Sequence, residues 1–441
     1  MKGNRIFGFT AALLFVMFVT TGLWAQDLRF DGYINSGLGI VTNDNEDNDP
    51  FFKVFGVDSE SNGFRFRLNG SYTNEAKNAG ARFRFQGQRR LDQVGYLSMP
   101  YLYGWVGFFQ NRLTFTGGLI DDGTWASADW WLGDDGGEGL GLLFKAEPLK
   151  GLIFGVGAYT ISQQSGGSNN ILLYSSATKD PVTGIYTYGN AATPNLNAIT
   201  PKPEDVKYTF NLAYTMPDTF RFNAIFRTQN KAAWAKNRYN EDYDYSGQEE
   251  SMLFQSEFRL LAVKNLTAIV VGRFDRLQDF DNSGNITISE ALGGKIDNLN
   301  IGLNAVQFFY NRTDKVSGDK VEYNPSLLFN PWISYNVDKV VPRLDLVYFM
   351  GGRSKLSNGS NQWERRGFVN VDKAKDDDDS YSVFSIRPSI RFNLDSRTFF
   401  EIGDVINYDM AAKDGAYMTS GDINKKSLFS NVFYVDLKFS F

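Results

Sequence analysis

The sequence alternates apolar and polar residues with a period of two in one segment after another. In segment 206–216, Tyr208 and Phe210 share one face, whereas Lys207 and Thr209 share the other. The same alternation recurs in segments 220–227, 254–260 and 384–393. A period of two is typical of β-strands whose two faces meet different surroundings. The chain is therefore predicted to be all-β.

The lengths of the segments and of their linkers indicate which β-fold they form. A soluble β-sandwich also has one buried and one wet face per strand. The segments here are about ten residues long, as a tilted membrane strand requires. The short linkers are 110–111, 148–150, 217–218, 263–265, 338–340 and 395–396. The long linkers are roughly 42–50, 121–137, 163–204, 229–250, 276–296, 354–380 and 409–426.

Alternating short and long linkers are typical of a transmembrane antiparallel β-barrel with short periplasmic turns and long extracellular loops. We therefore expect this fold. A closed bacterial barrel has an even number of strands, but about 17 strands can be counted in the sequence, where strand boundaries are the hardest feature to predict. Between 297 and 337 one strand is either missed or counted in excess, so 16 and 18 strands both fit.

The composition agrees with a barrel. The chain has 38 Phe, 22 Tyr and 8 Trp, yet its mean hydropathy is −0.31. A chain that is rich in aromatic residues but polar on average must concentrate its apolar residues on particular surfaces. A lipid-facing wall around a wet interior does so.

The start of the chain has the layout of a secretory signal peptide. Lys2 and Arg5 precede an uncharged apolar run, 6–19, and a small residue, Ala25, ends the more polar stretch that follows. An uncleaved anchor is the alternative, but it needs about 20 apolar residues to span a membrane. We expect residues 1–25 to be a signal peptide and residues 26–441 to form one barrel domain.

Two residue types are absent from the sequence. Without cysteine the chain has no disulfide and no thiolate metal site. Without histidine it has no Ser-His-Asp triad and no imidazole acid–base catalysis. The net charge of −5 gives no reason to expect a nucleic-acid partner. We expect neither an enzyme nor a required cofactor.

The end of the chain is a further strand, 427–441. The apolar residues on one of its faces are Val435, Leu437, Phe439 and Phe441. This pattern resembles the C-terminal assembly signal of bacterial outer-membrane proteins. The resemblance implies an outer-membrane location in a diderm bacterium, with the barrel-assembly machinery and membrane lipid as partners.

Two neighbouring segments carry inward arginines, which are Arg65, Arg67, Arg82 and Arg84. The linker after the fifth segment carries acidic residues, which are Asp121, Asp122, Asp129, Asp134, Asp135 and Glu138. This arrangement resembles that of the general porins, in which an acidic loop faces arginines across the pore constriction. The resemblance implies a constriction with a basic wall and an acidic loop. The alternatives are arginines that are simply solvated and a loop that folds outward.

The linker 279–290 matches the pattern of an EF-hand calcium loop. Its oxygen ligands would be Asp279, Asp281, Ser283, Asn285, Thr287 and Glu290. The alternative is an ordinary polar surface loop. Calcium is therefore a possible ligand of this linker.

The leading functional hypothesis is a porin-like channel for passive diffusion of small hydrophilic solutes. A barrel of sixteen or more strands leaves an aqueous channel. General porins are usually homotrimers, so the resemblance implies a homotrimer as a possible assembly of this chain. The alternatives are a substrate-specific channel and a surface adhesin. A sugar channel would show aromatic residues along the lumen, whereas most aromatics here are expected on the outer face.

Overall fold

The alternating segments form strands in the computed structural model. It describes residues 27–43, 50–55, 63–90, 96–120, 139–160, 177–179, 186–188, 206–228, 252–310, 312–313, 320–321, 325–351, 381–409 and 429–441. Within these residues there is no helix both long and apolar enough to cross a membrane. The helical segments described are the short η4 (Leu277–Asp279) and α3 (Phe280–Ser283).

The main sheet is antiparallel, and consecutive strands pair around it. Its first half comprises β1 (Asp27–Asn43), β2 (Phe51–Phe55), β3 (Gly63–Thr73), β4 (Ala79–Arg90), β5 (Tyr96–Phe108), β6 (Leu113–Ile120), β7 (Gly139–Leu149), β8 (Leu152–Thr160), β11 (Val206–Met216) and β12 (Phe220–Arg227). Its second half comprises β13 (Leu253–Leu260), β14 (Leu266–Asp275), β15 (Asn285–Ile296), β16 (Leu299–Tyr310), β19 (Ser326–Tyr335), β20 (Val340–Gly351), β21 (Tyr381–Asn393), β22 (Phe399–Asp409) and β23 (Phe429–Ser440).

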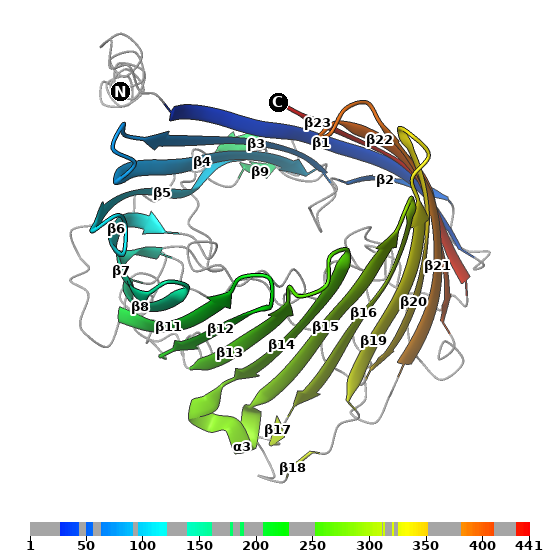
Figure 1. Ribbon diagram of the computed structural model, residues 1–441. Helices are drawn as coiled ribbons and strands as arrows, with labels where there is room; N and C mark the ends of the chain where they lie inside the picture. Colours follow the sequence, from blue (N-terminus) through cyan, green and yellow to red (C-terminus); the bar gives the residue numbers. More distant parts are fainter. Residues whose placement is uncertain are drawn as a thin grey trace.

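The sheet closes into a barrel where β1 pairs with β23 over eleven described residues, from Tyr33↔Ser440 to Asn43↔Ser430 (Figure 1). The other edge of β1 pairs with β3 near its start and with β2 near its end, so β2 and β3 share one position around the barrel. The barrel therefore has 18 strands, which resolves the choice between 16 and 18. Two small hairpins, β9 (Ala177–Lys179) with β10 (Tyr186–Tyr188) and β17 (Arg312–Thr313) with β18 (Lys320–Val321), stand apart from it.

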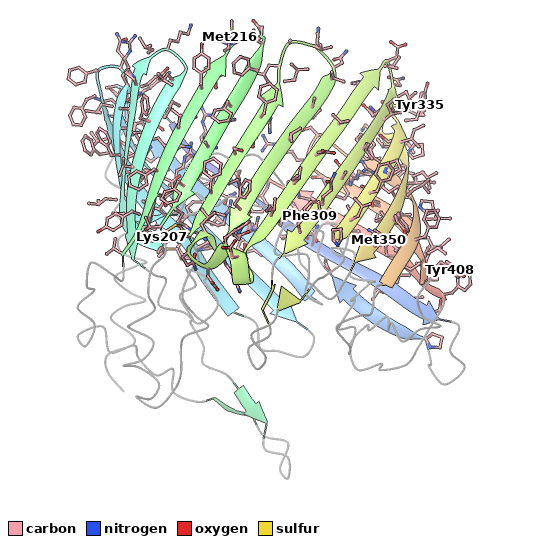
Figure 2. The ribbon with its side chains drawn as sticks, turned by 90° about the horizontal axis from the view of Figure 1, so that it is seen from below. Lys207, Met216, Phe309, Tyr335, Met350 and Tyr408 are labelled. Atoms are coloured by element: carbon pink, nitrogen blue, oxygen red, sulfur yellow. The ribbon has the colours of Figure 1, made fainter. Side chains whose placement is uncertain are left out.

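The two faces of each strand differ as the alternation predicts. Outward apolar side chains are exposed, for example Phe210, Leu212 and Phe439, at 40–50% of their full surface. Their neighbours along the strands, such as Thr209 and Asn211, are buried. Figure 2 shows side chains over the outer surface, with Met216 and Tyr335 at the rim that carries the turns and Met350 and Tyr408 nearer the opposite rim. The apolar face therefore forms a band around the barrel.

The turns at one end of the barrel have a local cause. Several turn residues have a positive φ, which Asn, Asp and Gly adopt more easily than other residues. They include Asn111, Asp218, Asn265, Asp338 and Gly151. Each lies in or beside a predicted short linker. The chain therefore reverses where its sequence permits left-handed backbone.

One predicted linker is wrong. Residues 276–296 were expected to form a loop, but β15 occupies Asn285–Ile296 and pairs with both β14 and β16. A two-residue turn at Asp297 and Asn298, with φ of 51° at Asp297, then leads into β16. Glu290 interrupts the apolar alternation of β15, which disguised the strand. This strand restores the even count, and it lies before the stretch 297–337 in which the sequence placed the failure of parity. The expected signal peptide, 1–25, and most of the other long linkers lie outside the described residues.

Candidate functional site

The inner face of β3 and β4 carries the predicted arginines. Arg67 pairs with Tyr33 of β1 and with Gln86 of β4, and the register places Arg82 opposite Ser71. Phe66 and Phe83 alternate with these residues on the other face. For Arg65 the structure describes only the backbone pairing, opposite Asn35 and Gln88.

Neutral groups orient two of these arginines. Arg67 Nε donates a hydrogen bond to Gln86 Oε1. Arg84 Nε donates to Asn69 Oδ1 at 2.8 Å, and its guanidinium lies 4.8 Å from the centre of the Tyr101 ring. Such cation–π contacts contribute roughly 0.5–1 kcal/mol at exposed sites. They fix the direction of the guanidinium without neutralising its charge.

The strands on the other side of the seam continue this surface with paired charges. Arg343 forms an ion pair with Asp345 at 2.6 Å and stacks on Trp332. Arg391 forms one with Glu401 at 2.8 Å. Glu401 is 2% exposed and also accepts a hydrogen bond from the Tyr434 hydroxyl at 2.9 Å.

We call the water-accessible inner surface of β20–β23, β1, β3 and β4 the basic wall. Its cations are Arg29, Arg67, Arg82, Arg84, Arg343, Arg391 and Lys438. Two of them, Arg343 and Arg391, have side chains that are 36% and 37% exposed. Lys438 stacks on Tyr33 from the strand across the seam, at 4.8 Å. Cations therefore face water from β20 through the seam to β4.

On the strands from β5 to β14, more of the inner-face side chains are buried than on the basic wall. Six apolar or aromatic side chains form a buried cluster there, which are Tyr101, Tyr103, Ile120, Leu143, Tyr159 and Ile225. Polar side chains further along are also covered: Lys207 is 2% and Glu257 1% exposed. Arg273 is neutralised by Asp275 through two hydrogen bonds, of 2.7 and 2.8 Å. Lys145, Arg221, Arg227 and Arg259 on these strands stay partly exposed, so the inner face here carries solvated positive charge as well, beside a larger covered area.

Sequence reasoning missed the inner aromatic residues. Most aromatics were expected to face outward, but Tyr33, Tyr101, Tyr103 and Tyr159 lie on inner faces. Tyr101 and Tyr103 are two residues apart on β5, so the sequence alone shows that they share one face of the strand. The ion pair between Arg391 and Glu401 could not be predicted in this way, because it depends on the register of two strands. The predicted acidic loop residues, from Asp121 to Glu138, lie outside the described residues.

The six residues of the predicted calcium loop occupy three different settings. Asp279 ends η4, and Asp281 and Ser283 lie in α3, whereas Asn285, Thr287 and Glu290 belong to β15. Thr287 is 2% exposed on the inner face, and Glu290 has the opposite parity. Among the described residues, no three Asp, Glu, His or Cys side chains gather as metal ligands. Calcium binding by this segment stays a prediction.

The predicted assembly residues lie on the outer face of the seam. Leu437, Phe439 and Phe441 are 45–50% exposed, and Val435 is partly covered. Phe441 exchanges two backbone hydrogen bonds of 3.0 Å with Gly32 of β1. The position suits an exposed recognition strand, and its role in assembly stays a prediction.

No protein-family model matches the sequence, and no curated protein matches it. Solved structures do resemble the fold. The crystal structure of Pseudomonas aeruginosa OpdQ is similar with a TM-score of 0.51 and 8% identity, covering 95% of this chain and 98% of that one. A BenF-like porin from Pseudomonas fluorescens Pf-5 is similar with a TM-score of 0.50 and 10% identity, covering 95% and 100%. The fold is therefore that of outer-membrane porins, as the sequence predicted.

Proposed function

We propose that the protein is an outer-membrane channel through which small hydrophilic solutes diffuse passively, and that it favours anions. The observation that carries the proposal is the basic wall. Cations on one side of a confined, low-dielectric passage raise the local concentration of anions. The porin fold supports the membrane location and a role without turnover.

The charges on the inner faces favour anions over cations. The basic residues placed there by the strand register are Arg29, Arg67, Arg82, Arg84, Lys145, Lys207, Arg221, Arg227, Arg259, Arg273, Lys295, Arg343, Arg387, Arg391 and Lys438. The acidic residues placed there, with their side chains described, are Asp31, Glu257, Asp275, Asp345, Glu401 and Asp436. The chain as a whole has a net charge of −5, so the inner surface departs from the overall balance in the direction of anion binding.

A channel selective for particular solutes is the second candidate. The inner tyrosines favour it, because aromatic rings beside cations can contact the apolar parts of an organic anion. Tyr101 already stacks with Arg84, and Tyr103 packs beside it at 5.7 Å between ring centres.

Planar bilayer recordings of the purified protein test the proposal. We expect stepwise conductance and a reversal potential that indicates anion preference under a potassium chloride gradient. Inhibition of chloride current by millimolar organic anions, with little effect of uncharged sugars, would favour the selective channel. Absence of conductance from a folded, inserted barrel would contradict both candidates.

A further inference from the structure

Strands β12 and β13 lie across the barrel from the seam (Figure 1), and two arginines face one another on their inner side. The register sets Arg221 of β12 directly opposite Arg259 of β13. Side chains at such positions have Cβ atoms about 4.5–5.5 Å apart, and like charges there are destabilising. The next residues in the same row, Thr215 of β11 and Ile269 of β14, carry no charge. The residues directly opposite the two arginines therefore do not offset this repulsion.

A third cation lies close to this pair. Lys145 of β7 is near enough to Arg221 for the two positive charges to repel one another. The cross-strand neighbour of Lys145 on β8 is Gly155, which has no side chain to separate the two cations. We call Lys145, Arg221 and Arg259 the three-cation cluster. All three residues are partly exposed, so the cluster is open to water.

The carboxylates beside the cluster do not balance its charge. Glu257 is two residues from Arg259 and 1% exposed, and its Oε1 lies 3.7 Å from Arg259 Nε. That distance is too long for a hydrogen bond, and this buried Nε has no hydrogen-bond acceptor in the described part of the chain. Glu147, two residues from Lys145, accepts a hydrogen bond of 2.7 Å from the Gly151 N–H. Two carboxylates thus stand beside three cations, and one guanidinium donor lacks an acceptor.

The cluster lies toward the rim of the barrel that carries the short turns. Arg221 is the second residue of β12, and Arg259 is the last but one of β13. Lys145 is four residues before the end of β7. Short turns face the periplasm in bacterial outer-membrane barrels, so we expect the cluster to be reached from the periplasmic mouth of the passage.

We propose that the three-cation cluster binds a tetrahedral oxyanion of the phosphate class. A guanidinium presents a fork of N–H donors to two oxygens, an ammonium acts as a compact point charge, and both groups bind phosphate. A phosphate group carries about two negative charges near neutral pH and three strong acceptor oxygens. It can therefore contact the two facing guanidiniums and the ammonium together, whereas a monocarboxylate offers fewer oxygens and one charge. Binding would remove the repulsion within the cluster.

Calorimetry with the purified barrel in detergent tests the proposal, with inorganic phosphate as the probe and the ionic strength held constant by potassium chloride. Arg221→Gln combined with Arg259→Gln should weaken binding by about ten-fold or more, because two charge-assisted contacts are lost. Lys264→Gln combined with Lys295→Gln removes as many exposed cations near the same rim and is the matched control. We expect the control to bind phosphate as the parent does. Heat-modifiable migration in gels shows that each variant is folded.

Urea unfolding gives a second readout that needs no conduction. Phosphate should raise the unfolding midpoint of the parent more than potassium chloride of the same ionic strength, because a ligand of the folded state stabilises it. The double arginine variant should lose this difference. A comparison with glycerol 3-phosphate separates two sources of the group: tighter binding of the ester indicates phosphorylated solutes, and tighter binding of inorganic phosphate indicates the free ion.

Three results would overturn the proposal: no phosphate binding by the folded parent, equal affinity of the parent and the double arginine variant, or an equal loss in the lysine control. The proposal rests on the proposed function, because an aqueous passage must reach the cluster. The two can nevertheless fail separately. A barrel that conducts without binding phosphate contradicts the site alone, and a barrel that binds phosphate without conducting contradicts the channel alone.

Discussion

At the scale of single residues, the seam of the barrel depends on one glycine. A Cβ at Gly32 would lie 2.2 Å from the Arg67 carbonyl oxygen and 2.7 Å from the Phe441 ring. Gly104, on the same outer face, would place a Cβ no closer than 3.5 Å to its nearest neighbour. There is therefore no room for a side chain at Gly32, whereas Gly104 has room for one.

Gly32→Ala is expected to destabilise the barrel by about 1–3 kcal/mol, because the new methyl group displaces backbone or the Phe441 ring. Urea unfolding followed by tryptophan fluorescence measures the change. Gly104→Ala is the control and should stay within about 0.5 kcal/mol of the parent. Equal effects of the two substitutions would show that the seam does not depend on this contact.

Asp395 stabilises the turn between β21 and β22. Its carboxylate accepts hydrogen bonds from the backbone N–H groups of Arg397 and Thr398, at 2.7 and 2.8 Å. These bonds, that of Arg397 first, lower the pKa of Asp395 below its ordinary value of 3.8. The contribution is therefore complete above the ordinary pKa and is lost as the pH falls through the lower pKa of the folded state.

The Asp395→Asn variant should lose this part of the acid sensitivity. We expect the parent and the variant to differ most in unfolding midpoint near neutral pH, and to converge as the pH falls through the lowered pKa of Asp395 in the folded state. Glu75→Gln, in the exposed turn between β3 and β4, is the control. A constant difference at all pH values would contradict the role of the Asp395 charge.

At the scale of elements, strand β4 differs from β20–β22 in the groups that contact its arginines. Arg84 bonds to Asn69 and stacks on Tyr101, and Arg82 is exposed. On β20–β22, by contrast, Asp345 and Glu401 offset Arg343 and Arg391. The uncompensated charge is therefore expected on β4.

Arg82→Glu combined with Arg84→Glu should shift the reversal potential toward cations, because four units of charge change on the solvated inner wall. Lys150→Glu combined with Lys264→Glu is the matched control, since both lysines are exposed in turns at one rim. We expect the control to shift the potential much less. Unchanged selectivity in the arginine variant would mean that these residues do not face the narrowest part of the passage.

At the scale of the whole molecule, the basic wall acts by a field that salt screens. The Debye length falls from about 10 Å at 0.1 M to about 3 Å at 1 M. We therefore expect the anion preference, measured as a permeability ratio, to fall as symmetric salt is raised between these concentrations. A ratio independent of salt would favour a discrete anion-binding site over a general field.

The sequence determined the fold class because the period of two repeats over most of the chain and any one-residue slip would invert both faces of a strand. It also determined the inward direction of Arg67, Arg82 and Arg84, since the phenylalanines beside them must face lipid. It did not determine β15, because Glu290 breaks the alternation there and the surrounding oxygens match a calcium loop.

Only the tertiary structure decided which residues meet across the barrel. The ion pair of Arg391 with Glu401 joins β21 to β22, and the contact of Phe441 with Gly32 joins β23 to β1. The buried apolar cluster on the inner face between β5 and β12 also depends on closure, because its residues come from five strands. Periodicity fixes the face on which a side chain lies, because this is a local property of the strand. The neighbours of that side chain follow from register and closure, which are set by pairing between distant segments.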